Sequence, residues 1–128
     1  MERQRIEIPV IILEWSEWYP WNRFLKDVRN DTDAIRVPPK PGVYEVRIDQ
    51  NDERLTIGKA SNLRRRVKQG LVKGMVPHST GDRIRGLVDV NQINIRWAIT
   101  DRPSACEEEL HRLYIKQFGR LPVYTIRT

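Results

Sequence analysis

The stretch from Gly42 to Arg66 combines residue types that suit contact with a phosphate backbone. Gly42-Val43-Tyr44 places a tyrosine in a strand-like segment, Gly58-Lys59 ends a second short run, and three consecutive arginines follow at 64–66. From Arg54 to Gly81 the chain has seven lysines and arginines and no Asp or Glu, although the whole chain contains 17 acidic residues. A long cationic surface beside a positioned tyrosine suits a protein that binds a phosphate backbone and cuts it.

The length and charge of the chain indicate one small basic domain. The 128 residues carry a net charge of +6, which favours a polyanionic partner. An anionic membrane is the competing partner, but no long amphipathic basic helix is predicted. Cys106 is the single cysteine, which excludes an intramolecular disulfide and a cysteine-based metal cluster. The apolar run at 8–13 is too short to span a bilayer, so a soluble cytoplasmic protein is expected.

The spacing of apolar residues predicts an α+β domain over residues 37–128. Strands are predicted at 43–48, 54–57 and 93–99, and the first two form an antiparallel hairpin. Ile93, Ile95, Trp97 and Ile99 are predicted to face the core. Helices are predicted from Ser61 or Asn62 to about Lys73, at 81–88, and from Pro103 to Phe118, with Gly119 as the stop. The simplest architecture is a three-stranded antiparallel sheet flanked by helices.

Residues 1–36 are predicted to form an extension packed on this core. A strand is expected at 6–13, where the proline suits an edge position in a sheet, and a helix is expected at 20–29. The extension is rich in aromatic residues, which are expected to pack against the domain, with stacking on bases as the alternative. These residues are Trp15, Trp18, Tyr19 and Trp21.

In this order and spacing, the motifs resemble those of the GIY-YIG nuclease family over residues 42–125. Gly42-Val43-Tyr44 is similar to the first motif, and Thr56-Ile57-Gly58 is similar to the second, with its tyrosine replaced by threonine. The run from Gly58 to Arg66 matches the Gly-Lys-x-x-Asn-Leu-x-x-Arg pattern that follows. The segment from Glu107 to Pro122 is similar to the family's carboxylate helix and its exit. The resemblance implies a DNA endonuclease that hydrolyses phosphodiester bonds with one divalent metal ion, Mg²⁺ or Mn²⁺. Duplex DNA is the expected partner and RNA the alternative.

The resemblance also implies catalytic roles. Tyr44 would act as the base or position the attacking water, and Arg66 would bind the scissile phosphate through its planar guanidinium. A free phenol is a poor base at neutral pH, so it needs a nearby cation, and Lys59 is the expected one. Thr56 takes the position of the second-motif tyrosine.

One glutamate of the last helix would bind the metal ion, since hard cations prefer oxygen ligands. Glu107, Glu108 and Glu109 are consecutive and point in different directions on a helix. Glu107 shares a stripe with Tyr114 and Phe118 and is the preferred ligand, and Glu109 is the second choice. Acidic residues in the first turn also stabilise a helix dipole without any metal, which is the structural alternative.

Several positions depart from the family's pattern, and they bear on turnover more than on fold. Thr56 replaces a tyrosine, Gly70 stands where a tyrosine or histidine is common, and Thr125 stands where an asparagine is common. His78 could supply a missing polar group from its loop. The alternative functions are therefore a nucleic-acid-binding module of the same fold that has weakened or lost turnover, and a basic interaction domain that contacts RNA or ribosomes and never had activity.

Nucleic-acid contacts are expected mainly from the acid-free stretch. The residues are Arg54, Asn62, Arg64, Arg65, Lys68, Lys73 and His78. Each type also has a purely structural use: a run of arginines is commonly a solvated helix face, and a tyrosine on a half-apolar strand is commonly a core residue. The two histidines have no metal-ligand spacing with the cysteine, which favours structural roles for them.

Overall fold

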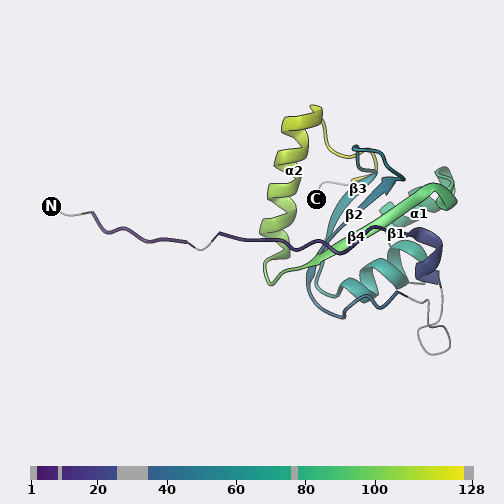
Figure 1. The fold of residues 1–128 in the computed structure, drawn as a ribbon, viewed down its shortest axis with the longest axis horizontal. Helices are drawn as coiled ribbons and strands as arrows, with labels where there is room; N and C mark the ends of the chain where they lie inside the picture. The colour runs from purple at the N-terminus through teal and green to yellow at the C-terminus, as the bar shows by residue number, and fades with distance from the viewer. Residues whose placement is uncertain (1–2, 9, 26–34, 76–77, 126–128) are drawn as a thin grey trace.

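A computed structural model describes residues 3–8, 10–25, 35–75 and 78–125, which form an α+β fold around an antiparallel sheet (Figure 1). The strands are β1 (Tyr19–Pro20), β2 (Gly42–Ile48), β3 (Thr56–Ala60) and β4 (Ile93–Ile99). Their order in the sheet is β1-β4-β2-β3. The predicted fold class is confirmed: β4, β2 and β3 are the three expected strands, and the two-residue β1 adds a fourth at the edge.

β2 is the central strand and pairs antiparallel with both β3 and β4. Tyr44 lies opposite Gly58 on β3 and opposite Trp97 on β4. Because side chains alternate along a strand, Tyr44 and Val46 point to one face of the sheet, and Val43 and Glu45 point to the other. The predicted hairpin is confirmed, although its return strand runs from Thr56 to Ala60 rather than over 54–57.

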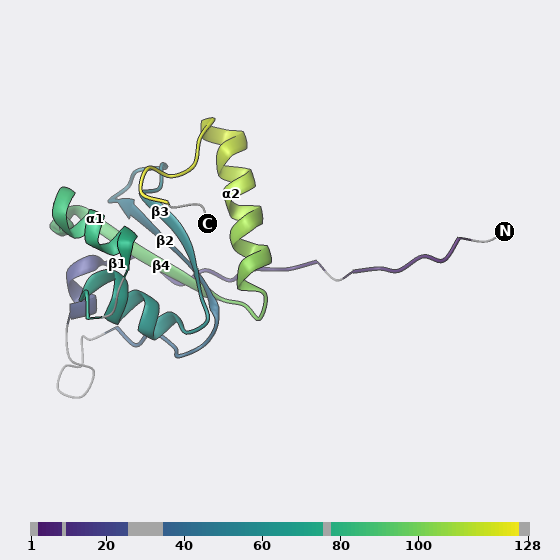
Figure 2. The ribbon, with the colours of Figure 1, turned by 180° about the vertical axis from the view of Figure 1, so that it is seen from behind.

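Helices cover both faces of the sheet (Figures 1 and 2). On the Tyr44 face lie η1 (Trp21–Leu25), η2 (Arg64–Val72) and α1 (Ser79–Leu87), which share one core cluster with Tyr44 and Val46. On the other face lies α2 (Pro103–Phe118), whose Cys106 packs with Val43 and Ala98. The short η3 (Val90–Gln92) leads into β4. As predicted, α2 begins with a proline and ends at Gly119, which has φ 76° and is in the left-handed conformation.

Helix η2 occupies the predicted position but is wound as a π-helix, with hydrogen bonds that span five residues. The backbone N–H of Lys73 donates to the carbonyl of Lys68 at 2.9 Å. At the start of the helix, the Oδ1 atom of Asn62 accepts from the backbone N–H of Arg65 at 3.1 Å. Asn62 therefore caps the first turn, one of the two capping positions that the sequence predicted.

Two predictions about strands are wrong. No strand forms at 6–13: the described residues 3–8 and 10–18 are extended but lie outside the sheet's ladders. The first described backbone hydrogen bond to the sheet comes from Ser16, whose N–H donates to the carbonyl of Trp97 at 2.8 Å. Before it, Leu13 and Trp15 contact the sheet through their side chains, against Val43 and Ala98, and form no ladder. On β4, Ile99 is half exposed while Ala98 is buried, because α2 covers the face to which Ala98 points.

Of the predicted helix at 20–29, the structure describes η1 (Trp21–Leu25), a 3₁₀ helix; residues 26–29 lie outside the described residues. The aromatic residues of this region contact the sheet. Trp21 and Phe24 are buried in the core, and Tyr19 stacks on Trp97 with ring centroids 5.4 Å apart. The division into residues 1–36 and 37–128 stays a prediction.

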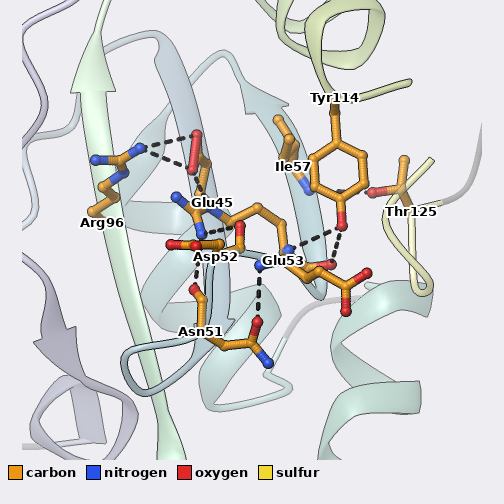
Figure 3. A network of polar contacts seen from close by, with 9 residues as sticks. Glu45, Asn51, Asp52, Glu53, Ile57, Arg96, Tyr114 and Thr125 are labelled. Carbon is orange, nitrogen blue, oxygen red and sulfur yellow. Dashed lines mark hydrogen bonds and ion pairs between the residues drawn. The ribbon is translucent and has the colours of Figure 1, made fainter. Parts of the chain in front are cut away.

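A cluster of ion pairs lies on the sheet face opposite Tyr44 (Figure 3). Glu45 is 4% exposed and binds the guanidinium groups of Arg54 and Arg96, at 2.6 Å and 3.0 Å. Trp18 lies over both guanidinium groups, with carbon-to-centroid distances of 4.9 Å and 4.5 Å. Arg54 thus stabilises the sheet, and it does not occupy the exposed position expected of a nucleic-acid contact.

Candidate active site

A polar pocket lies at the outer edge of β3, between η2, α1 and the first turns of α2. Its volume is about 140 Å³. The five residues predicted for catalysis and metal binding all line it: Tyr44, Thr56, Lys59, Arg66 and Glu107. The rest of the lining described is Ile57, Gly58, His78, Ser79, Thr80 and Thr125. The strand pair, η2 and α2 therefore bring together side chains that are up to 63 positions apart in the chain.

The position of Tyr44 explains the glycine of the second motif. Gly58 is the direct partner of Tyr44 in the β2–β3 ladder, and the tyrosine ring crosses it. A Cβ atom on Gly58 would lie 2.4 Å from both the Cζ atom and the hydroxyl oxygen of Tyr44. No side chain fits there without movement, so the glycine allows the tyrosine to reach across the strand into the pocket.

His78 holds the hydroxyl group of Tyr44. The Nε2 atom of His78 lies 3.0 Å from the Tyr44 hydroxyl oxygen, and both side chains are buried. The same histidine precedes α1, and its Nδ1 atom accepts from the backbone N–H of Gly81 at 3.0 Å. Because Nδ1 accepts, the neutral ring carries its proton on Nε2 and donates it to the oxygen of Tyr44. His78, expected to contact nucleic acid or to supply a polar group from its loop, lies in the pocket, and its contact with nucleic acid stays a prediction. A histidine before Ser-Thr-Gly and a helical pattern was the available sequence signal for its capping role.

Burial and nearby charges set the protonation of this pair. Burial raises the pKa of Tyr44 to about 12, against the opposing effect of Arg66, which is a nearby positive charge and also donates a hydrogen bond; Glu107 raises it further. Burial, followed by the charges of Arg66 and Arg85, lowers the pKa of His78 to about 4. Near neutral pH both groups are therefore uncharged. The cation that acts on the Tyr44 pKa is Arg66, whereas the predicted Lys59 donates from Nζ to the Ser104 hydroxyl at 3.2 Å.

Two residues that depart from the family pattern, Thr56 and Thr125, contact each other. The hydroxyl groups of Thr56 and Thr125 lie 3.0 Å apart. The Thr125 hydroxyl also accepts from the backbone N–H of Ile57 at 3.1 Å, which fixes the C-terminal segment along the edge of β3. The two positions are 69 residues apart, and nothing in the sequence pattern indicates that they form a pair.

Of the three consecutive glutamates, only Glu107 lines the pocket. Glu109 points to the other side of α2, where it forms an ion pair with Arg112, and Glu108 is exposed. Within the described residues, no group of three His, Cys, Asp or Glu side chains could hold a metal ion. A single carboxylate still fits Mg²⁺, which commonly keeps several waters and binds one or two carboxylates together with substrate phosphate. Among the described residues that line the pocket, Glu107 is thus the carboxylate available to such a cation.

The residues expected to contact nucleic acid separate into two groups. Arg64, Arg65 and Lys73 are exposed along η2 and its end. Lys68 differs from expectation, because it is 4% exposed and its Nζ atom donates to the carbonyl of Ile35 at 3.0 Å. Lys68 lies beside the buried apolar stripe of η2, so its ammonium group faces the interior. A run of basic residues does not by itself reveal which of them the helix turns inward.

Comparisons with known proteins give a likeness of fold. No known protein-family profile matches the chain, and no curated protein matches it. Among solved structures, the chain is similar to the GIY-YIG N-terminal endonuclease domain of UvrC from Thermotoga maritima, bound to its catalytic divalent cation, magnesium. The identity is 23% and the TM-score 0.43, over 70% of this chain and 88% of that chain. A point mutant of the same domain, bound to its catalytic divalent cation, is 24% identical with a TM-score of 0.43, over 71% and 88%. None of the described helices is long and apolar enough to cross a membrane.

Proposed function

We propose that this protein is a metal-dependent endonuclease that hydrolyses phosphodiester bonds in DNA, with a site of the GIY-YIG type. The observation that carries the proposal is the convergence of Tyr44, Arg66 and Glu107 in one polar pocket. The three residues come from the central strand, from η2 and from α2. Fold stability does not require a phenol, a guanidinium and a carboxylate to meet in a cavity, whereas together these groups can orient a water, bind a phosphate and hold a cation, which suits cleavage of a phosphodiester.

Tyr44 orients the attacking water in this proposal. With a pKa of about 12, Tyr44 is a neutral phenol at neutral pH, so it is not already deprotonated and ready to act as a base. His78 donates to its oxygen, and the positive charge of Arg66 lowers its pKa, so both would stabilise negative charge there if the proton leaves during attack. His78 therefore supplies the polar group that Gly70 lacks, from the start of α1 rather than from η2.

Arg66 binds the scissile phosphate. Its guanidinium lies at the pocket and matches two phosphate oxygens, which fixes the phosphorus in line with the water and stabilises the extra charge of the transition state. Glu107 would hold the divalent cation. When bound, such a cation would neutralise charge on the phosphoryl oxygens and the leaving oxygen.

The substrate contacts follow from the exposed cations beside the pocket. Arg64, Arg65 and Lys73 lie on η2, which also carries Arg66 to the pocket. Contacts of this kind neutralise phosphates in any sequence, so binding to duplex DNA should be strong at low salt and should weaken steeply as salt rises. RNA is the alternative substrate, and the relative affinities for the two duplexes decide between them.

A module that binds nucleic acid without turnover is the second candidate, and two observations favour it. The raised pKa of Tyr44 makes proton removal costly, and Thr56 and Thr125 bond to each other rather than offering a second tyrosine hydroxyl to the pocket. In this case the pocket would bind a phosphate and leave it intact.

A nicking assay separates the two functions. Supercoiled plasmid is incubated with the purified protein and Mg²⁺ or Mn²⁺, with EDTA as a control. We expect nicking by wild type and loss of nicking in Arg66→Ala, Tyr44→Phe and Glu107→Gln. Arg83→Ala is the matched control, because Arg83 is exposed on α1 and does not line the pocket. Equal nicking by Arg66→Ala and wild type would contradict the proposal. No nicking by wild type with salt-sensitive binding retained would establish the binding module instead.

A further inference from the structure

The Arg85 side chain joins α1 to the C-terminal end of η2. Its Nη1 atom donates to the carbonyl oxygens of Gly70 at 3.0 Å and of Leu71 at 2.5 Å. The two carbonyls before these already accept from backbone N–H groups that follow η2. The last carbonyls of a helix lack partners within it and form its negative end, so a guanidinium there satisfies them and complements the helix dipole. Arg85 thus caps a helix other than its own.

Two glycines leave room for this guanidinium group, whose side chain is 26% exposed. A Cβ atom on Gly74 would lie 2.9 Å from both the Cζ and Nη2 atoms of Arg85, and one on Gly81 would lie 2.9 Å from its Nη1 atom. The Cβ atom on Gly81 would also lie 2.7 Å from the carbonyl oxygen of Leu71, which is backbone and cannot rotate away. A side chain at either glycine would therefore displace the arginine from the carbonyls or push α1 away from η2.

The two helices that Arg85 joins each position one of the groups that act on the Tyr44 hydroxyl. Helix η2 carries Arg66, whose positive charge lowers the pKa of Tyr44. His78 caps α1, and its Nε2 atom lies 3.0 Å from the Tyr44 hydroxyl oxygen. The Nδ1 atom of His78 accepts from the backbone N–H of Gly81, the same glycine that approaches Leu71 on η2. The contact between the helices therefore sets where the His78 ring lies relative to Arg66.

We propose, on the basis of the nuclease function proposed above, that Arg85 is a positioning residue for the reaction. It holds α1 against η2 so that His78 and Arg66 act on the Tyr44 hydroxyl at the same time. Arg85 is not among the described residues that line the pocket, so its effect on the reaction passes through the two helices.

Helix α1 has other attachments, which should keep it in place when Arg85 is changed. Ile84 is fully buried in the core cluster, and the Thr80 hydroxyl donates to the carbonyl of Tyr124 at 3.1 Å. Loss of Arg85 should therefore move His78 without unfolding the helix. A displacement of about 1 Å in a group that acts on the reaction costs about 10²-fold in rate.

The test measures plasmid nicking with kcat and KM separated. Arg85→Ala should lower kcat by about 10²-fold and leave KM for DNA nearly unchanged. Arg85→Lys keeps the positive charge but replaces the planar guanidinium with an ammonium group, so kcat should fall here too. Free guanidinium ion at low millimolar concentration should restore part of the kcat of Arg85→Ala, because the two glycines leave its site open. Arg83→Ala is the matched control, since Arg83 is exposed on the same helix, and it should keep both wild-type values.

Nitrogen NMR of the His78 ring gives a readout that does not require activity. Both ring nitrogens are hydrogen-bonded in the wild type. In Arg85→Lys, which keeps the charge, the His78 signals should move toward those of a solvent-exposed imidazole. The signals of His111, which lies 2.9 Å from the carbonyl oxygen of Ile57 through its Nε2 atom, should stay in place. The chain has two histidines, so His78→Asn is sufficient to assign the spectrum.

The outcomes separate this role from the nuclease function itself. Wild-type nicking with equal kcat in Arg85→Ala and Arg85→Lys would overturn the positioning role and leave the nuclease function standing. A raised KM at unchanged kcat would also overturn it, because it would assign Arg85 to DNA binding, as would a lower melting temperature with both constants unchanged. If the wild type does not nick, the nuclease function fails, and unchanged His78 signals in Arg85→Lys would show that Arg85 does not hold the histidine either.

Discussion

Gly58→Ala tests whether the position of Tyr44 controls the pocket. The added methyl group would lie 2.4 Å from the Cζ atom and the hydroxyl oxygen of Tyr44, well inside ordinary van der Waals contact at 3.4–4 Å. The tyrosine must therefore move by about 1 Å, and a displacement of that size in a catalytic group costs about 10²-fold in rate. Overpacking of a buried position destabilises by about 1–3 kcal/mol. For a domain of this size the melting temperature should fall by about 5–10 °C.

The assay pairs thermal unfolding with plasmid nicking, and it has an internal control. Gly86 lies in α1, and a Cβ atom there meets nothing within 4 Å, so Gly86→Ala should leave nicking unchanged and raise stability by about 0.5 kcal/mol through helix propensity. A double-mutant cycle isolates the clash: in a Tyr44→Leu background, which lacks the outer ring atoms, Gly58→Ala should cost almost nothing in stability. Equal costs in the two backgrounds would refute the reasoning, as would wild-type nicking by Gly58→Ala.

Three further predictions concern the ion-pair cluster, the histidine and the basic helix. In denaturant titrations, Glu45→Gln should lower the free energy of unfolding by about 3 kcal/mol, because it leaves two partly buried guanidinium groups without a counter-charge. The control Glu53→Gln breaks an exposed pair with Arg120 and should lower it by less than about 0.5 kcal/mol. The pKa of His78 falls from 6.5 to about 4 on folding, so below pH 6.5 the unfolded chain takes up a proton that the folded chain does not. Stability should therefore decline as pH falls from about 6.5 to about 4, and His78→Asn should flatten this decline; an unchanged slope in the variant would show that other groups cause it. The double variant Arg64→Ser/Arg65→Ser should weaken DNA binding about equally for all sequences. It should also reduce the slope of log affinity against log salt by up to about 2. An unchanged slope in a fluorescence titration would mean that these arginines contact no phosphate.

Local patterns in the sequence were sufficient for the main elements of this fold. Alternation over a few residues placed β2 and β4, and Pro103 and Gly119 marked the two ends of α2. The helical stripe of α2 separated Glu107 from its two neighbours, and Glu107 is the glutamate that lines the pocket. These predictions succeeded because periodicity, caps and turns depend on residues within one or two turns of each other.

Only the tertiary structure decided which distant side chains meet. The bond between His78 and Tyr44 and the pair of Thr56 with Thr125 join residues 34 and 69 positions apart. Lys68 is turned inward by the packing of η2, and the apolar run at 6–13 finds no strand partner because β4 is paired further along the chain, at Tyr19 and Pro20. A basic or alternating pattern states what a segment could contact. Which contact forms depends on the packing of the whole chain. Here that packing places His78 and Arg66 near the Tyr44 hydroxyl and leaves Ile6, Ile8, Val10 and Ile12 exposed.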